Sequence, residues 1–136
     1  MKVIGIEIDK SKVVLYAIEV VGGNIENLMG EFQSLTLKNG EDNREVIKFK
    51  ETVHSFFDDI SPDAIAIVAR QSKGRFKSAS ISFKLEGLLQ LYDKVEIEFI
   101  SPHTLTAFYK KNPFPITIQH KYQETAAKLA NYLTIR

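Results

Sequence analysis

Two carboxylates, Glu7 and Asp9, stand on one face of the first apolar segment of the chain. Residues 2–8 alternate as in a β-strand, so isoleucines occupy the opposite face. Gly5 shares the face of the carboxylates and removes side-chain bulk, which allows a close approach there. Carboxylates at the end of a central strand are candidate metal ligands. The alternative is a solvated strand end, where acidic residues are common.

A basic segment is the second candidate site. No acidic residue lies between Asp63 and Glu86, and five basic residues do: Arg70, Lys73, Arg75, Lys77 and Lys84. This loop is expected to follow a parallel strand and to precede a helix, a common location of anion sites. Phe76 adds an aromatic ring that could stack on a base, and Lys110 and Lys111 could extend the basic surface. The alternative is a solvated loop that happens to be basic.

A histidine and a carboxylate form a third candidate site. His120 and Glu124 are four residues apart, and such a pair shares one face of a helix. The spacing suits a metal or acid–base pair, and the alternative is a solvated face that precedes the apolar stripe of the helix. His54 lies beside an apolar helical stripe and is interpreted as a boundary residue, not a ligand.

Composition limits the classes of protein to consider. The chain has 136 residues, 44% of them hydrophobic and 26% charged, as in a soluble globular protein of one domain. The absence of cysteine excludes disulfides, thiolate zinc sites and a cysteine nucleophile. The net charge of +1 means that any polyanion must bind to a local patch. With no leader and no apolar run of membrane-spanning length, we expect a cytoplasmic protein without membrane contact.

The first 60 residues predict three antiparallel strands followed by a helix. The strands are expected at residues 2–8, 13–21 and 28–37. The helix is predicted from apolar side chains at helical spacing between residues 46 and 60. Asp42 and Glu45 are spaced as a capping box at its start.

The rest of the chain alternates helices and strands. Residues 63–70 predict a buried strand that joins the sheet parallel to the first. The next helix contains Gly87, which we expect at a close helix contact. A strand at residues 95–100 and helices at 101–111 and 122–133 complete the series. The order predicts an α/β fold: a five-stranded mixed sheet, a three-stranded antiparallel meander plus parallel strands, with helices on both faces.

This order resembles the RNase H-like superfamily, and three segments resemble its RuvC-type resolvase branch. GIEIDKSK (residues 5–12) is similar to that branch's motif Gly-Ile-Asp-Pro-Gly-Ser, with Glu7 at the catalytic aspartate. Ser101 and Pro102 resemble the Ser-Pro turn before the branch's next helix. ETAAKLA (residues 124–130) resembles the Asp-Ala-Ala-Asp-Ala-Leu-Ala signature of its last helix.

Two longer segments carry a more specific resemblance. ARQSKGRFKSASISFKLEGLLQL (residues 69–91) and ISPHTLTAFYKKNPFPI (residues 100–116) resemble a family of short bacterial proteins of unknown function within this superfamily. The likeness spans nearly the whole chain. It implies the fold, and it brings no established activity.

Two positions depart from the resolvase pattern. Arg70 occupies the position of a glutamate, and the second aspartate of the last-helix signature falls on Ala127. Two-metal hydrolysis requires several carboxylates around ions about 4 Å apart. Glu7 and Glu124, with Asp9 as a substitute, could hold one magnesium or manganese ion weakly. We expect Arg70 to pair with Glu7 or Glu124 in place of an ion.

The sequence therefore predicts one RNase H-like domain over residues 1–136 with a degenerate, non-catalytic site. The domain is expected to bind nucleic acid, DNA or RNA, or another phosphate-rich partner, without a cofactor. The predicted contacts are Arg70, Lys73, Arg75, Phe76, Lys77, Lys110 and Lys111. The first alternative is a magnesium- or manganese-dependent, structure-selective endonuclease that uses Glu7, Asp9 and Glu124. The second is a protein–protein interaction scaffold, for example a homodimer.

Overall fold

The computed structural model describes residues 1–69 and 76–136, with the backbone alone at residues 69 and 76–79. The described part contains one mixed sheet with strands β1 (Lys2–Asp9), β2 (Lys12–Val21), β3 (Asn24–Asn27), β4 (Ser34–Thr36), β5 (Ala64–Ala69) and β6 (Ile97–Phe99). Their order is β3-β2-β1-β5-β6, and β4 pairs with β2 as well. β1 is antiparallel to β2 and parallel to β5. The predicted central position of the first strand is confirmed.

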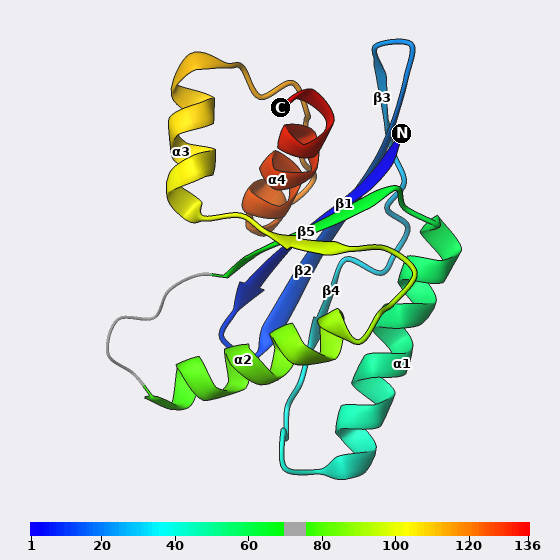
Figure 1. Cartoon of the computed structure of the whole chain (residues 1–136), viewed down its shortest axis with the longest axis vertical. Coiled ribbons are helices and arrows are strands. Elements are labelled where there is room, and N and C mark those ends of the chain that lie inside the picture. Colours follow the sequence, from blue (N-terminus) through cyan, green and yellow to red (C-terminus); the bar gives the residue numbers. More distant parts are fainter. Residues whose placement is uncertain (70–75) are drawn as a thin grey trace.

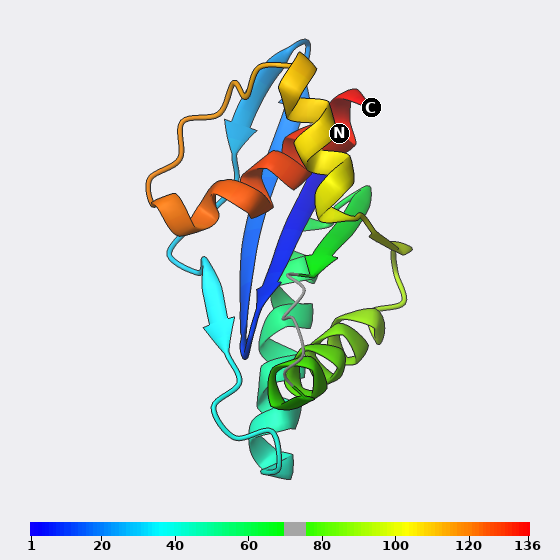
Figure 2. The same ribbon diagram turned by 90° about the vertical axis from the view of Figure 1, so that its left-hand side faces the viewer.

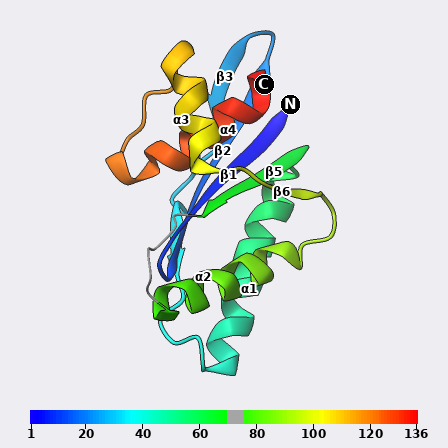
Figure 3. The same ribbon diagram turned by 60° about the vertical axis from the view of Figure 1, so that its left-hand side comes forward.

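The helices cover both faces of this sheet. They are α1 (Asn43–Ile60), α2 (Phe76–Gln90), α3 (Pro102–Lys111), the 3-10 turn η1 (Lys121–Gln123) and α4 (Glu124–Ile135). Helices α1 and α2 lie on one face, and α3 and α4 lie on the other (Figure 1, Figure 3). The side view of Figure 2 shows the sheet between the two layers. The predicted α/β class, a mixed sheet with helices on both faces, is confirmed.

Alternation along β1 divides the apolar interior into two cores. Ile4, Ile6 and Ile8 are fully buried against α1 and α2, where large side chains dominate. Val3 points to the opposite face, where small residues of α4 pack. The alternating side chains of one strand therefore serve two different cores.

Gly5 is the closest contact between the sheet and α4. A Cβ atom at this position would lie 2.2 Å from the carbonyl oxygen of Ala126 and 2.6 Å from the backbone nitrogen of Ala130. Such distances are far below van der Waals contact, so only glycine permits this packing. The sequence predicted a close approach at Gly5, and the approaching group is the backbone of α4.

The predicted third strand, residues 28–37, is mostly wrong. Only Ser34–Thr36 of that range form a strand, β4, whereas β3 (Asn24–Asn27) precedes it, and the chain leaves the ladder between residues 28 and 33. The side-chain oxygen of Asn27 accepts a hydrogen bond from the Met29 amide at 2.7 Å, which turns the chain away from β2. The amide of Ala17 then donates to the sulfur of Met29 at 3.0 Å.

The start of α1 differs from the predicted capping box. Asp42 is the N-cap and accepts from the Arg44 amide, as expected of such a residue. Glu45 does not return to Asp42, because its carboxylate accepts from the amides of Lys38 and Asn39 at 2.7 and 2.9 Å. Glu45 therefore ties the preceding loop to the helix.

Helix α2 corrects one prediction and supports another. Gly87 is exposed, and a Cβ there would meet nothing within 4 Å, so the predicted close helix contact is wrong. Gly87 lies on a solvated face of α2, where no packing contact requires a glycine. His54 of α1 donates through Nε2 to the carbonyl of Leu88 at 2.8 Å, as a residue at the edge of the core does.

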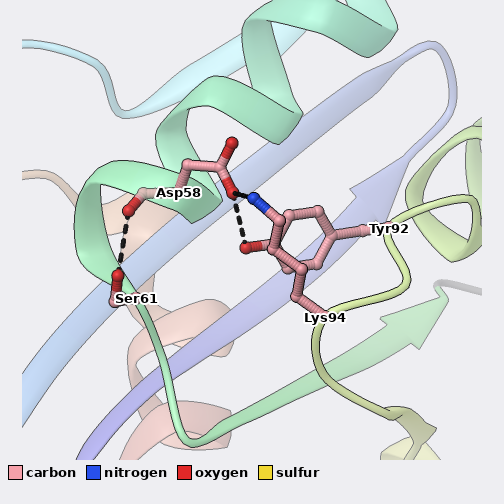
Figure 4. A network of polar contacts seen from close by, with 4 residues as sticks. All are labelled: Asp58, Ser61, Tyr92 and Lys94. Atoms are coloured by element: carbon pink, nitrogen blue, oxygen red, sulfur yellow. Dashed lines mark hydrogen bonds and ion pairs between the residues drawn. The ribbon is translucent and has the colours of Figure 1, made fainter.

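A polar network ties the end of α1 to the segment that follows α2 (Figure 4). Asp58 accepts from the Tyr92 hydroxyl at 2.9 Å and from the Lys94 ammonium at 2.7 Å. The Ser61 hydroxyl donates to the backbone carbonyl of Asp58. Burial, followed by the hydrogen bond to Asp58, raises the pKa of Tyr92 to about 12. The tyrosine thus remains a donor over the whole physiological range.

In the part of the chain that the structure describes, no helix is both long enough and apolar enough to span a bilayer.

Candidate functional site

Three carboxylates gather at the carboxyl end of β1. Glu7 is only 6% exposed and is the register partner of Val68 on β5. Asp9 is the last residue of β1, and Glu124 is the first residue of α4. All three line one cavity of about 280 Å³, which we call the acidic pocket. The structure thus brings together the three acidic residues that the sequence singled out.

The turn before α4 sets the position of Glu124. Gln123 is buried, and its side-chain oxygen accepts from the His120 amide at 3.0 Å. His120 is therefore the N-cap of η1 and lies outside α4. The predicted shared helical face of His120 and Glu124 is wrong, because the backbone of His120 is extended and a 3-10 turn separates it from α4. The His120 ring stacks on Tyr122 instead, with ring centroids 5.4 Å apart.

Tyr122 was predicted to begin the last helix, but it lies in η1, before α4. It is 40% exposed, and its hydroxyl donates to the side chain of Gln33 at 2.8 Å. The ammonium of Lys12 lies 5.1 Å from its ring centroid. Tyr122 therefore forms part of the wall of the acidic pocket.

Lysines balance the carboxylates of this region. Lys12 and Lys121 line the acidic pocket. Lys128, one helical turn after Glu124, pairs with its carboxylate at 3.3 Å. Sequence reasoning missed all three lysines as site residues. A signal existed for two of them, because Lys12 faces Asp9 across the hairpin and Lys128 follows Glu124 at helical spacing.

A second cavity lies on the other side of Glu7, between α3, α4 and the ends of β1 and β5. We call it the α3 pocket, and its volume is about 350 Å³. Its lining consists of Glu7, Val68, Pro102, Leu105, Thr106, Tyr109, Lys110, Thr125 and Lys128. Glu7 therefore lines both cavities.

Tyr109 holds the two helices around the α3 pocket. Its hydroxyl donates to the carbonyl of Lys128 at 2.7 Å and accepts from the Asn131 amide group at 2.8 Å. Burial raises the pKa of Tyr109, so its hydroxyl stays protonated and continues to donate. Asn131 is 1% exposed, and this hydrogen bond satisfies its buried amide group.

The donor set does not fit a two-metal centre. Ala127, at the position of the second aspartate, is fully buried and carries no ligand atom. Glu124 is paired with Lys128. Within residues 1–69 and 76–136, no three Asp, Glu or His side chains are grouped so that they could hold a metal ion. The residues that the structure describes thus lack the convergent oxygen ligands that paired divalent ions require.

Most of the predicted basic contacts fall outside the described residues. This holds for Arg70, Lys73 and Arg75, and for the side chains of Phe76 and Lys77, which begin α2. The predicted pairing of Arg70 with Glu7 or Glu124 lies outside them too. Lys110 and Lys111 form the last turn of α3, and Lys110 lines the α3 pocket.

Comparison with solved structures identifies the class of fold. Thermus thermophilus RuvC superposes with a TM-score of 0.75 at 15% identity, covering 96% of this chain and 91% of that one. The T. thermophilus RuvC in complex with a Holliday junction substrate gives 0.74 at 16%, covering 96% and 90%. The yeast mitochondrial Holliday junction resolvase Ydc2 gives 0.55 at 12%, covering 79% and 53%. At these identities the likeness establishes the fold, which is RNase H-like.

The family follows from the sequence. The model of the family described as "Protein of unknown function (DUF3010)" matches residues 1–133, and the chain belongs to this family. A comparison with curated proteins gives no match. The resemblance to an RNase H-like family of unknown function, inferred from the sequence segments, is confirmed.

Proposed function

We propose that this protein binds nucleic acid without cleaving it, through the surface around Glu7. The observation that carries the proposal is the distribution of lysines at this surface. Lys12 and Lys121 line the acidic pocket, and Lys110 and Lys128 line the α3 pocket. The ammonium groups of Lys12, Lys110 and Lys121 are suitable partners for phosphate oxygens, and Lys128 is paired with Glu124.

The overall charge makes this local arrangement important. With a net charge of +1, the chain has no broad positive field, so a polyanion must be held by a cluster of cations. Two of the similar structures are named as Holliday junction resolvases or include a junction substrate, which supports DNA as the first partner to test. RNA and other phosphate-rich partners share the same chemistry.

The acidic residues support binding without cleavage. Glu7, Asp9 and Glu124 share one pocket, but Ala127 removes a ligand position and Lys128 neutralises Glu124. Arg70, at the position of a further glutamate in the resolvase pattern, removes another carboxylate. The site thus keeps part of the acidic set and adds positive charge, which favours a phosphate over a divalent ion.

Salt dependence of binding tests the proposal. Affinity for a fluorescein-labelled four-way DNA junction is measured by anisotropy at several salt concentrations. For the double variant Lys110→Ala/Lys121→Ala, we expect the slope of log K against log salt to become shallower by about two units. The matched control, Lys48→Ala/Lys50→Ala, removes the same charge from α1 on the opposite face and should leave the slope unchanged. Equal slopes in both double variants would overturn the proposed surface.

A cleavage assay addresses the alternative function. The labelled junction is incubated with the protein and magnesium or manganese, and the products are separated on a denaturing gel. We expect intact junction. Cleavage that disappears in Glu7→Gln would instead establish a metal-dependent, structure-selective endonuclease that uses Glu7, Asp9 and Glu124. Absence of any binding at low salt would favour a protein–protein scaffold, with sedimentation of the protein alone reporting a homodimer.

A further inference from the structure

The α3 pocket has the dimensions of a small-molecule site. Its volume of about 350 Å³ is near the lower end of the roughly 300–1,000 Å³ that such sites occupy. It also lies beyond the carboxyl ends of the neighbouring parallel strands β1 and β5, where α/β sheets commonly bind ligands. A pocket of this size accommodates one planar ring system.

The α3 pocket combines apolar and aromatic walls with charged side chains. Val68, Leu105 and Pro102 provide apolar surface, and Tyr109 adds an aromatic ring. Apolar and aromatic walls suit the faces of a heterocyclic base. Every base can stack on such surfaces, because each has a π-face. Lys110 adds a cation to the same lining, and Lys128 beside it is paired with Glu124, so a ring in the pocket and a phosphate at Lys110 can be held together.

Glu7 supplies the polar group that can read the edge of a base. Its side chain is 6% exposed and comes from β1, a rigid central strand. An ionised carboxylate has two oxygens with about four acceptor positions, so it can accept from a ligand in addition to its contacts within the protein. Guanine presents two adjacent donors, N1–H and the 2-amino group, which match the two oxygens of a carboxylate.

We propose that the α3 pocket binds one unpaired base of the nucleic acid, with guanine preferred, and that Lys110 contacts the phosphate beside it. This inference rests on the proposed function and names the substrate of the same surface. An unpaired base enters without the cost of opening a base pair, so bulges, loops and single strands are the expected ligands.

The experiment compares short labelled DNA duplexes that differ at a single bulged nucleotide. The bulge carries guanine, inosine or thymine, and the fully paired duplex is included. Inosine lacks the 2-amino group of guanine and therefore loses one hydrogen bond to Glu7. We expect the guanine bulge to bind about tenfold more tightly than the inosine bulge. Glu7→Gln should abolish this difference.

A pair of α3 variants provides a control that leaves the carboxylate intact. Thr106 lines the pocket and Ala107 does not, and both are exposed. Thr106→Trp should fill the cavity and remove the preference for the guanine bulge, whereas Ala107→Trp should retain it. Persistence of the preference in Thr106→Trp would overturn the inference.

Two further outcomes separate this inference from the proposed function. Equal, salt-dependent affinity for all bulges and for the paired duplex would overturn the pocket assignment and leave nucleic-acid binding intact. No binding to any of these DNAs would overturn both. Free guanosine monophosphate is titrated in parallel, and Glu7-dependent binding of this nucleotide without a preference among the bulged DNAs would assign the pocket to a free nucleotide and overturn the inference as stated.

Discussion

The two faces of the sheet are built from different residues for different purposes. The face under α1 and α2 is filled by large apolar side chains such as Phe57 and Leu89, both fully buried. The face under α3 and α4 packs small residues, including Ala126, against Gly5, and it contains a buried carboxylate, Glu7. Large side chains bury more apolar area per residue and stabilise the fold more. Close backbone packing instead brings polar groups from distant segments together.

The difference separates the face that stabilises the fold from the face that carries the proposed binding surface. Both pockets around Glu7 lie on the face with α3 and α4. The opposite face is held at its edge by the Asp58, Tyr92 and Lys94 network, whose role is structural. Substitutions on one face should therefore change mainly the free energy of unfolding, and substitutions on the other should change binding as well.

The largest expected effect is a loss of stability from a substitution in the core under α1 and α2. Leu89→Ala removes a fully buried side chain from the core of α1 and α2 and should lower the free energy of unfolding by about 4 kcal/mol. Urea denaturation measures this loss. DNA affinity of the folded variant at low temperature should equal that of the wild type. A variant that is folded but has lost DNA binding would contradict the division of roles.

The next largest effect is expected from a substitution on the face covered by α3 and α4. Gly5→Ala places a Cβ against the backbone of Ala126, so α4 must move, and we expect a loss of about 3 kcal/mol in stability. DNA affinity should fall as well, because α4 carries Glu124 and Lys128.

Gly87→Ala is the matched control for Gly5→Ala. Its Cβ meets nothing within 4 Å, and alanine favours a helix, so this variant should gain up to about 1 kcal/mol. Equal stability of the two alanine variants would show that α4 does not depend on the glycine.

A smaller effect tests whether the basic loop belongs to the proposed binding surface. The basic loop predicted from the sequence includes Lys73 and Arg75, outside the described residues. If this loop contacts phosphates, Lys73→Ala/Arg75→Ala should reduce the salt slope of DNA binding by about two units without changing stability. An unchanged slope would confine the binding surface to the pockets around Glu7.

The smallest effect concerns pH. Hydrogen bonds from Lys94 and then Tyr92 hold the pKa of Asp58 below its ordinary value. The folded state therefore favours the ionised carboxylate, and this contribution is present above the ordinary pKa of Asp and is lost as the pH falls through the lower, folded value. Thermal melts between about pH 6 and pH 3 should show less acid destabilisation for Asp58→Asn than for the wild type. Asp59→Asn removes a neighbouring carboxylate that makes none of the hydrogen bonds of this network, and it serves as the matched control.

Much of the fold could be predicted because two periodicities are clear in the sequence. Alternation along residues 2–8 indicated which side chains of β1 face which core, and helical spacing indicated α1 and α4. The meeting of Glu7 and Glu124 followed from the resemblance to resolvase motifs, since no local pattern relates residues so distant in sequence.

The errors arose where local contacts outweigh periodicity. Asn27 turns the chain out of the third strand through a side-chain hydrogen bond, and the 3-10 turn before α4 separates His120 from Glu124. The lysines around Glu7 were missed because exposed lysines are common in any sequence. Only tertiary structure places Lys12 and Lys128 beside the same group of carboxylates.

The contact between Gly5 and α4 also has a consequence for how the chain folds during synthesis. The β1–β2 hairpin is local in sequence and can pair as soon as it is synthesised, but α4, which covers its Val3 and Tyr16 face, follows all the other described helices and strands. Until α4 packs, this apolar face is uncovered, and the closing contact joins Gly5 to residues more than a hundred positions away in sequence, which slows folding. The acidic pocket is therefore complete only once α4 has packed against β1, because Glu124 belongs to that helix.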